Sequence, residues 1–408
     1  MSAAGSASAQ AAGSAVPVSM DLAGLDVSGS PGHRQLRFSV EPRVPGSASS
    51  GTAYIGEAVD RSLESFLLGL CLPDNAFWVN LTPDPGAQSI DPRIADTDTG
   101  KILLAADLLL KKDTSSLTNP RTSPAGRKYW ELLYAKAAEL GIEDIPISSR
   151  VWIVPGPVRI SEQADSVRIE ESGLDICLET ERLYGRKKNA LTPKQLELYD
   201  YSSRLMKELI VPALRQKVNE GASYDQLRQV YRAQVLARWY RERFLRNDPS
   251  MKAALPSGSN QFRSRLPYNF STIYRQYMDS LRQGEYDISD SSSGRLCAYM
   301  ELITRRYFSG GIDWRSIPTA SASYLDRGPQ TCAAGSLYFS ITLDSRRQRP
   351  LQYARESIRV MHADARETQA GPGSLVEDGL PSVSPVDVTV ATVLKQNLSL
   401  HRIISRNL

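Results

Sequence analysis

The sequence predicts an α+β protein in which helices surround a small antiparallel sheet. Apolar residues recur at helical spacing over residues 57–141 and again over residues 192–283. Between them, over residues 150–181, apolar residues alternate with polar ones, which is typical of strands. The chain has 408 residues, of which 41% are hydrophobic and 23% charged. That length and composition predict an ordinary globular protein with a core of substantial size.

The first part of the chain combines a polar leader with two strands and a helix. Residues 1–33 are rich in Ala, Ser and Gly, and we interpret them as a disordered leader. Residues 34–41 alternate in polarity as a strand does. Residues 57–72 carry apolar side chains at helical spacing until Pro73 ends the pattern. The apolar run at residues 76–81 predicts a further short strand.

Two helices are expected next. The run GKILLAADLLLKK is apolar on nearly all sides, so it predicts a central core helix. Asp98 or Thr99 suits its N-terminal cap. Lys111 and Lys112 suit its C-terminal end, where the helix dipole favours cations. A second helix is expected from Ser123, because serine caps helices and the proline that follows fits the first turn.

The remainder changes from strands to helices and back to a strand. Residues 150–181 contain the turn signal Pro155-Gly156-Pro157, so they predict three or four short antiparallel strands. Helices are expected over residues 192–283, with a kink or break at Pro212. Residues 336–343 alternate in polarity. We expect this strand and the strand near the N-terminus to join the sheet.

These patterns divide the chain into five segments. We expect a disordered leader at residues 1–33, an acidic α+β half at 34–181, a basic helical subdomain at 182–283, a mixed strand and loop region packing back on the core at 284–363, and a linker with a C-terminal tail at 364–408. The sequence contains no run of about 18 apolar residues, so we expect no membrane-spanning helix. The N-terminus lacks the pattern of a secretory signal, so a cytoplasmic location is expected.

Charge is segregated along the chain. The net charge of +4 combines −8 over residues 1–180, +11 over residues 181–283 and +1 over the rest. The basic segment predicts a patch on its helices, formed by Arg228, Arg232, Arg243 and Arg246. Its charge can be solvated or docked on the acidic half, can meet another protein, or can bind nucleic acid through arginines and aromatic rings. The first interpretation is favoured and nucleic acid is the least favoured.

Three aspartates, Asp91, Asp96 and Asp98, precede the core helix, and the segment at residues 96–101 begins like a calcium loop. That loop needs Asp or Asn at its fifth position and Gly at its sixth, where this chain has Gly100 and Lys101. Helix capping is the favoured interpretation, and a magnesium or calcium ion is the alternative. No catalytic motif, cofactor motif or zinc-type cysteine spacing is present, so we do not expect an enzyme. The enzyme alternative is a carboxylate- or metal-dependent hydrolase that uses these aspartates.

A non-catalytic interaction or structural protein is the leading prediction. Its partner is expected to be another protein or a second copy of the chain. Tyr, Trp and Arg are typical of interface hot spots. The segment that combines them is a candidate partner-binding patch, formed by Arg305, Arg306, Tyr307, Phe308 and Trp314. In the alternative interpretation, the three aromatic side chains of this patch close the core.

Several segments together resemble a group of uncharacterised bacterial proteins. They are AFWVNLTP at residues 76–83, TDTGKILLAADLLLKKDTSSLTNPRT at 97–122, RVWIVPG at 150–156, VPALRQKVNEGASYDQLRQVY at 211–231 and RRYFSGG at 305–311. The resemblance covers residues 76–311. It implies a shared order of segments, and no activity, ligand or catalytic residue follows from it.

Overall fold

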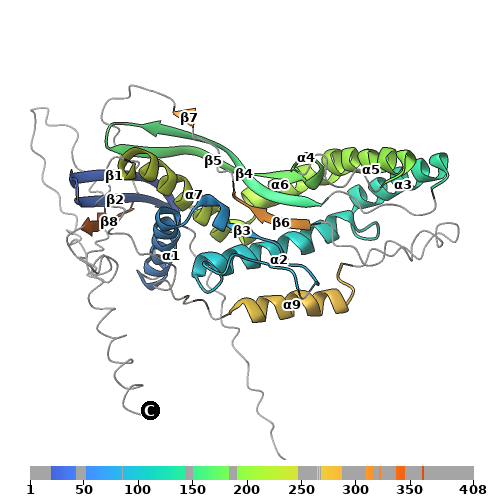
Figure 1. The fold of residues 1–408 in the computed structure, drawn as a ribbon, viewed down its shortest axis with the longest axis horizontal. Helices are drawn as coiled ribbons and strands as arrows, with labels where there is room; N and C mark the ends of the chain where they lie inside the picture. Colours follow the sequence, from blue (N-terminus) through green and yellow to red (C-terminus); the bar gives the residue numbers. More distant parts are fainter. Residues whose placement is uncertain are drawn as a thin grey trace, which may run out of the picture.

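The computed structural model joins strands from distant parts of the chain in one curled sheet, against which helices pack (Figure 1). It describes residues 20–42, 52–84, 86–142, 150–182, 191–246, 264, 266, 268–286, 309–315, 321–322, 337–344 and 361–362. The α+β class is confirmed. No helix in these ranges combines the length and apolarity that crossing a membrane requires.

The sheet is mixed and larger than predicted. Its strands are β1 (Met20–Ser30), β2 (His33–Pro42), β3 (Trp78–Val79), β4 (Val151–Glu162), β5 (Ser166–Leu178), β6 (Ser309–Asp313), β7 (Ser321–Ala322), β8 (Leu337–Asp344) and β9 (Met361–His362). The strand order is β3-β6-β4-β5-β1-β2-β8-β9, with β7 beside β4. β4 pairs in parallel with β6 and β7, and the other strand pairs are antiparallel. The pairing of β2 with β8 confirms that both predicted outlying strands join the sheet.

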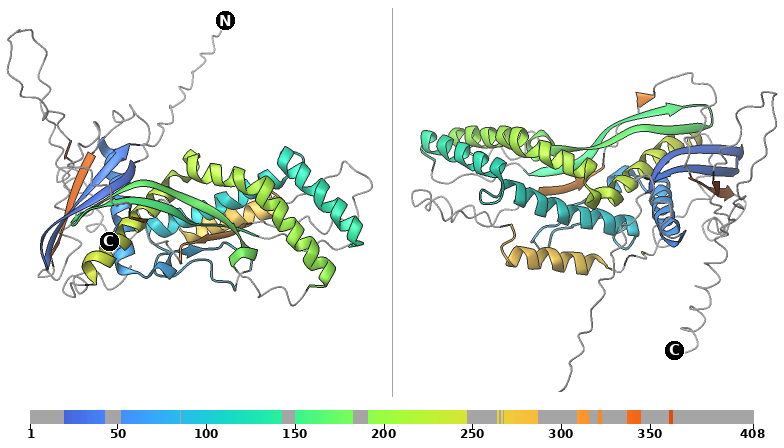
Figure 2. Two further views of the ribbon diagram at one scale, coloured as in Figure 1. Left: turned by 90° about the horizontal axis from the view of Figure 1, so that it is seen from above. Right: turned by 180° about the vertical axis from the view of Figure 1, so that it is seen from behind.

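Helices follow one another along the sheet. They are α1 (Thr52–Cys71), α2 (Asp98–Thr118), α3 (Pro124–Leu140), α4 (Glu179–Arg182), α5 (Pro193–Leu205), α6 (Val211–Glu220), α7 (Asp225–Tyr240) and α9 (Phe270–Arg282). Short 3-10 or π-helical turns follow some of them: η2 (Asp74–Ala76), η4 (Met206–Ile210), η5 (Ala222–Tyr224) and η6 (Arg241–Leu245). The predicted break at Pro212 takes the form of a π-helical turn, η4, directly before α6. Figure 2 shows α3 and α5 at the end of the molecule opposite β1 and β2.

The expected leader is wrong over residues 20–30, which form β1. Leu25 and Val27 are buried, whereas Asp26 between them is exposed. This alternation is the ordinary signal of a strand, but the surrounding Gly and Ser residues made the whole stretch resemble a disordered segment. β1 pairs with β2 along its length and with β5 at Gly24–Asp26.

The expectation of three or four short strands over residues 150–181 is also wrong. β4 and β5 are two long paired strands, and Pro155-Gly156-Pro157 lies within β4 at a shift of register. Proline has no N–H group to donate to the ladder of hydrogen bonds between strands. A β-bulge interrupts that ladder, so the prolines are tolerated there. A Cβ atom on Gly156 would lie 2.4 Å from the carbonyl oxygen of Gly173, so the close approach of the two strands requires glycine.

The ends of α2 differ from the prediction. Thr97 is the N-cap, with its side chain accepting a hydrogen bond from the Gly100 amide, in place of Asp98 or Thr99. The helix continues to Thr118, so Lys111 lies inside it and is fully buried. In contrast, α3 begins after the Ser123 cap as predicted.

The core lies between the sheet and the helices. Phe38 on β2 meets Phe66 on α1 with 4.9 Å between ring centroids. Phe66 also contacts Tyr240 at the end of α7, at 6.3 Å. These rings fix α1 and the end of α7 side by side, and this junction positions the candidate site.

Candidate functional site: an arginine-lined cavity

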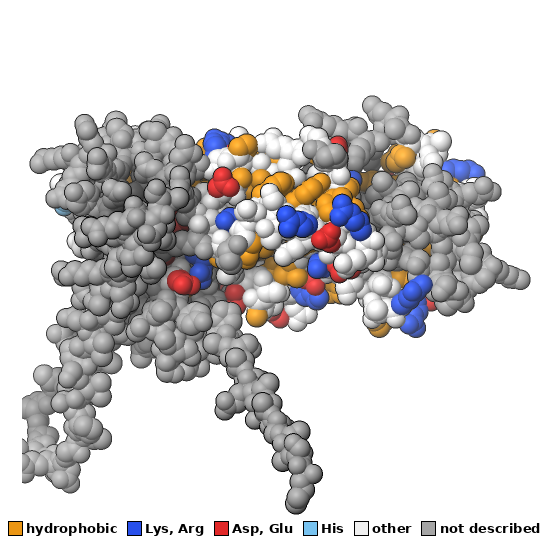
Figure 3. Space-filling model, turned by 90° about the horizontal axis from the view of Figure 1, so that it is seen from below, with side chains coloured by type: hydrophobic (Ala, Val, Ile, Leu, Met, Phe, Trp, Pro, Cys, Tyr) orange, Lys and Arg blue, Asp and Glu red, His pale blue; other side chains and the backbone are white. Residues whose placement is uncertain are grey.

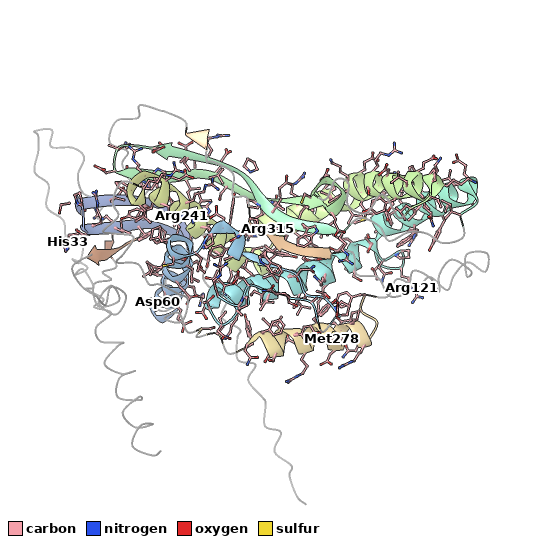
Figure 4. All side chains as sticks on the ribbon, viewed as in Figure 1. His33, Asp60, Arg121, Arg241, Met278 and Arg315 are labelled. Atoms are coloured by element: carbon pink, nitrogen blue, oxygen red, sulfur yellow. The ribbon has the colours of Figure 1, made fainter. Side chains whose placement is uncertain are left out.

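A cavity of about 320 Å³ lies where the end of α1 meets the end of α7. Figure 4 labels Arg241, which marks its position. We call it the arginine cavity and define it by its lining residues: Leu70, Asp74, Arg238, Arg241, Glu242, Leu245 and Arg246. It combines charged groups of both signs with two leucine side chains.

Five lining residues come from one face of a single helical segment. Position 238, the pair 241 and 242, and the pair 245 and 246 follow one another at intervals of three or four residues, so their side chains lie on one side of a helix. α7 ends within this segment and continues as the π-helical turn η6. Such turns are frequent at functional sites because they change the direction of successive side chains. Leu70 and Asp74 face this segment from the end of α1 and from η2.

Two of the arginines are held by carboxylates within the cavity. Arg238 lies 3.3 Å from a carboxylate oxygen of Asp74 and donates through Nε to Glu242 at 3.0 Å. Arg241 also pairs with Asp74 and donates to the Leu72 carbonyl at 3.1 Å. Their side chains are 23% and 24% exposed. The shared Asp74 carboxylate therefore orders both guanidinium groups before any ligand arrives.

Arg246 differs from these two arginines. Its side chain is exposed, and its guanidinium forms no hydrogen bond or ion pair with another described residue, whereas its backbone amide donates to the Arg241 carbonyl at 3.3 Å. The lining has three guanidinium groups and two carboxylates, which give the cavity a net charge of +1. A planar guanidinium suits a carboxylate or a phosphate, to which it donates two parallel hydrogen bonds. The cavity can therefore hold an anion, with Arg246 as the group that receives it.

The predicted basic patch does not form. Arg228 is 5% exposed and donates to the Val218 and Gly221 carbonyls, at 2.5 and 2.9 Å, at the end of α6. Arg232 lies 3.9 Å from the carboxylate of Asp21. Of the other two members, Arg243 pairs with Glu162 and Arg246 lines the cavity. The prediction of one four-arginine surface is corrected because tertiary contacts separate its members.

The basic segment instead docks on the acidic half of the chain. Among the described residues, the ion pairs between the basic segment and the acids that precede it in the chain include Lys207–Glu181, Arg215–Asp175, Lys217–Asp113, Arg232–Asp21, Arg238–Asp74, Arg241–Asp74 and Arg243–Glu162. In the described part of the lower face, Figure 3 shows Lys and Arg side chains scattered among hydrophobic, Asp and Glu side chains, without a continuous basic track. The segregation of charge along the sequence is thus largely cancelled in space.

The three aspartates of the weak metal prediction do not converge. Asp91 binds Arg93 through both carboxylate oxygens, at 3.0 and 2.7 Å, and these hydrogen bonds lower the pKa of Asp91. Asp98 is buried and accepts a hydrogen bond from the Leu266 amide at 3.1 Å. The backbone carbonyl of Asp96 accepts from the Ser264 amide at 2.9 Å. The described part of the chain contains no group of three or more His, Cys, Asp or Glu side chains arranged to hold a metal.

The predicted aromatic patch is described only at Trp314. This side chain is fully buried and contacts the Tyr231 ring at 5.6 Å. Its amide donates to the Phe77 carbonyl at 3.0 Å. Trp314 therefore closes the core and presents no surface to a partner. The other four members, Arg305, Arg306, Tyr307 and Phe308, lie outside the described residues.

Sequence reasoning missed a buried ion pair inside α2. Lys111 Nζ lies 2.7 Å from Asp107 Oδ1, and both side chains are fully buried. Asp107 also accepts a hydrogen bond from the Leu81 amide at 2.6 Å, and Lys111 lies over the Tyr277 ring at 5.9 Å. Burial raises the pKa of Asp107 and lowers the pKa of Lys111. The available signal was an Asp and a Lys four residues apart in an otherwise apolar helix.

Comparison of the chain with family models, with curated proteins and with solved structures gave no match. The resemblance to a group of bacterial proteins stays a prediction. The function is therefore argued from the arginine cavity and the surfaces around it.

Proposed function

We propose that this protein binds another protein without catalysing a reaction, and that the arginine cavity receives an anionic group of that partner. The observation that carries the proposal is the exposed Arg246 guanidinium beside two arginines already ordered by Asp74. Arginine is enriched among the residues that dominate binding energy at protein interfaces. Ordering of the neighbouring side chains in advance reduces the entropy lost on binding.

The contacts of the basic segment favour a protein partner over nucleic acid. Binding along a phosphate backbone needs several unpaired cations in a row, since affinity grows with each phosphate that is neutralised. Arg215, Lys217, Arg232 and Arg243 instead pair with acids of the same chain. A local cavity with a net charge of +1 suits one anionic group better than a polyanion.

The hydrolase alternative receives no support from the described aspartates. Asp91 is engaged by Arg93, and Asp98 accepts hydrogen bonds from the chain around Leu266. A carboxylate pair for acid–base chemistry needs two groups that converge on one reacting position. These side chains instead hold local backbone in place, which is a structural role.

A displayed library of random peptides tests the proposal. The full chain should enrich peptides that contain Asp, Glu or an acidic terminus. Arg246→Gln should lose that enrichment, because it removes the receiving guanidinium. Arg243→Gln is the matched control: Arg243 is also exposed and lies three residues away, but it pairs with Glu162 outside the cavity.

Two results of this experiment would overturn the proposal. One is enrichment of the same acidic peptides by Arg246→Gln, and the other is no enrichment by the unaltered chain. A parallel titration with a labelled single-stranded oligonucleotide separates the alternative function. Binding that weakens steeply with salt and persists in Arg246→Gln would favour nucleic acid.

A further inference from the structure

We infer that the arginine cavity selects a singly charged carboxylate attached to an aliphatic group, and that Asp74 excludes a doubly charged phosphate. This inference rests on the proposed function and names the chemistry of the group that the cavity receives. Three features of the cavity support it: its net charge, the position of Asp74 and the two leucine side chains in its wall.

The net charge of the lining matches a monoanion. Three guanidinium groups and two carboxylates leave one positive charge uncompensated, and Arg246 carries it. A carboxylate neutralises that charge, whereas a phosphate monoester dianion leaves the occupied cavity with a net charge of −1. In a partly buried site, where charges interact more strongly than in water, this difference is large enough to decide between the two anions.

Asp74 places a fixed negative charge in the wall of the cavity that would have to receive a phosphate. It accepts from both Arg238 and Arg241, and their guanidinium groups are thereby already neutralised on that side. The same contact gives an example of carboxylate binding at this site, since a carboxylate of the chain itself pairs with two arginines. A ligand carboxylate at Arg246 would add one negative charge beside an unpaired positive one, as Asp74 does beside Arg238 and Arg241. A dianion would bring a second negative charge, which Asp74 and Glu242 would repel.

Leu70 and Leu245 define the chemistry next to the anion. Both line the cavity: Leu70 is buried, and Leu245 is half-buried in contact with the core. Aliphatic surface on the ligand would remove from water the apolar surface that these side chains still expose, most of it on Leu245, which contributes about 25 cal/mol for each Å² buried. The side chain of a C-terminal residue, or the methylenes of an Asp or Glu, would supply such surface.

Hexanoate and hexyl phosphate provide a matched pair of probes with the same aliphatic tail. At pH 8 hexanoate carries one negative charge and the phosphate monoester about two. Binding to the full chain is followed by NMR through the Nε–H resonance of Arg246, assigned by its loss in Arg246→Gln. Arg243→Gln serves as the control that removes a neighbouring charge outside the cavity.

The unaltered chain should bind hexanoate more tightly than hexyl phosphate, by about tenfold, the ratio that about 1.4 kcal/mol represents. Asp74→Asn adds one positive charge while keeping an acceptor oxygen, so it should reverse the preference. Glu242→Gln provides a second test if the Asn variant does not fold, and it should shift the preference in the same direction. Arg243→Gln should leave the preference unchanged.

The outcomes separate this inference from the function on which it rests. Tighter binding of hexyl phosphate by the unaltered chain would overturn the carboxylate selection, and the anion-receiving function would stand. Absence of any shift at Arg246 with either probe would overturn both. An unchanged preference in both folded carboxylate variants would show that Asp74 and Glu242 do not set the selectivity.

Discussion

Replacing Lys111 with Met should destabilise the protein far more than an exposed lysine would. The pair Asp107–Lys111 is fully buried, with 2.7 Å between Nζ and Oδ1. Met preserves the length and apolar volume of the lysine stem, so the change isolates the charge. The Asp107 carboxylate would stay buried and would lose its ion pair, while keeping the hydrogen bond from the Leu81 backbone amide. Removing one partner of a buried pair costs about 3–5 kcal/mol.

The cost in Lys111→Met should depend on pH. Burial already raises the pKa of Asp107, and the charge of Lys111 opposes that rise. Without Lys111 the folded-state pKa rises further above the unfolded value of about 3.9. The folded protein then binds the proton more tightly than the unfolded chain. The loss of stability is therefore full above the folded-state pKa and diminishes as pH falls through it, by up to about 1.4 kcal/mol per pH unit.

Urea denaturation followed by tryptophan fluorescence at pH 7 and pH 5 measures both effects. The double variant Lys111→Met with Asp107→Asn removes both charges and keeps an acceptor for the Leu81 amide. It should lie within about 1 kcal/mol of the unaltered chain, because a well-packed neutral replacement of a buried pair is often neutral or stabilising. A single Lys111→Met variant that loses less than about 1 kcal/mol at pH 7, with no dependence on pH, would refute the reasoning.

Three other predictions concern Arg228, Gly310 and Cys71. Arg228→Met should lower the free energy of unfolding by about 2–4 kcal/mol, since it removes a buried donor from two carbonyl oxygens. Urea denaturation measures the loss, with the exposed Arg243→Met as the control. Equal losses in the two variants would contradict this prediction. Gly310→Ala should lower the melting temperature because its Cβ would lie 2.1 Å from the Trp152 indole, and the effect should shrink in a Trp152→Ala background. Burial raises the pKa of Cys71 to about 12. Iodoacetamide at pH 8 should therefore alkylate the folded protein at Cys71 roughly a thousandfold more slowly than a free thiol. Mass spectrometry follows the reaction, and in urea Cys71 should react at the rate of a free thiol.

Local signals predicted the helices well and the sheet less well. Ser123 and its following proline identify the start of α3 because the cap and the fixed proline dihedral act within one turn. The long pairing of β4 with β5 depends on contacts between residues far apart, and the local Pro155-Gly156-Pro157 signal favoured a turn. The strand β1 was also not predicted. Its Gly- and Ser-rich composition is typical of a disordered segment, although Leu25 and Val27 follow the alternation of a strand.

The sequence indicates the part of the arginine cavity that comes from one helical segment, but not the part that Asp74 contributes. Arg246 belonged to the predicted patch, and the spacing of positions 238, 241, 242, 245 and 246 is readable without a structure. Asp74 could not be assigned to the same site. It arrives there because α1 ends before Pro73 and the chain turns through η2 beside the end of α7. That approach is decided by packing of Phe66 against Tyr240, which has no local signature.

Charge segregated along a chain is a poor guide to charge on the surface. Opposite charges far apart in sequence attract as the chain folds, so a basic segment and an acidic half tend to neutralise each other. Arg243 and Arg246 show the distinction at a separation of one helical turn. Arg243 lies 2.6 Å from Glu162 and has satisfied its charge within the chain, whereas the Arg246 guanidinium lines a cavity and pairs with no other described residue. Arginines paired within the chain therefore indicate how the molecule holds itself together, and an unpaired guanidinium in a cavity indicates where it meets something else.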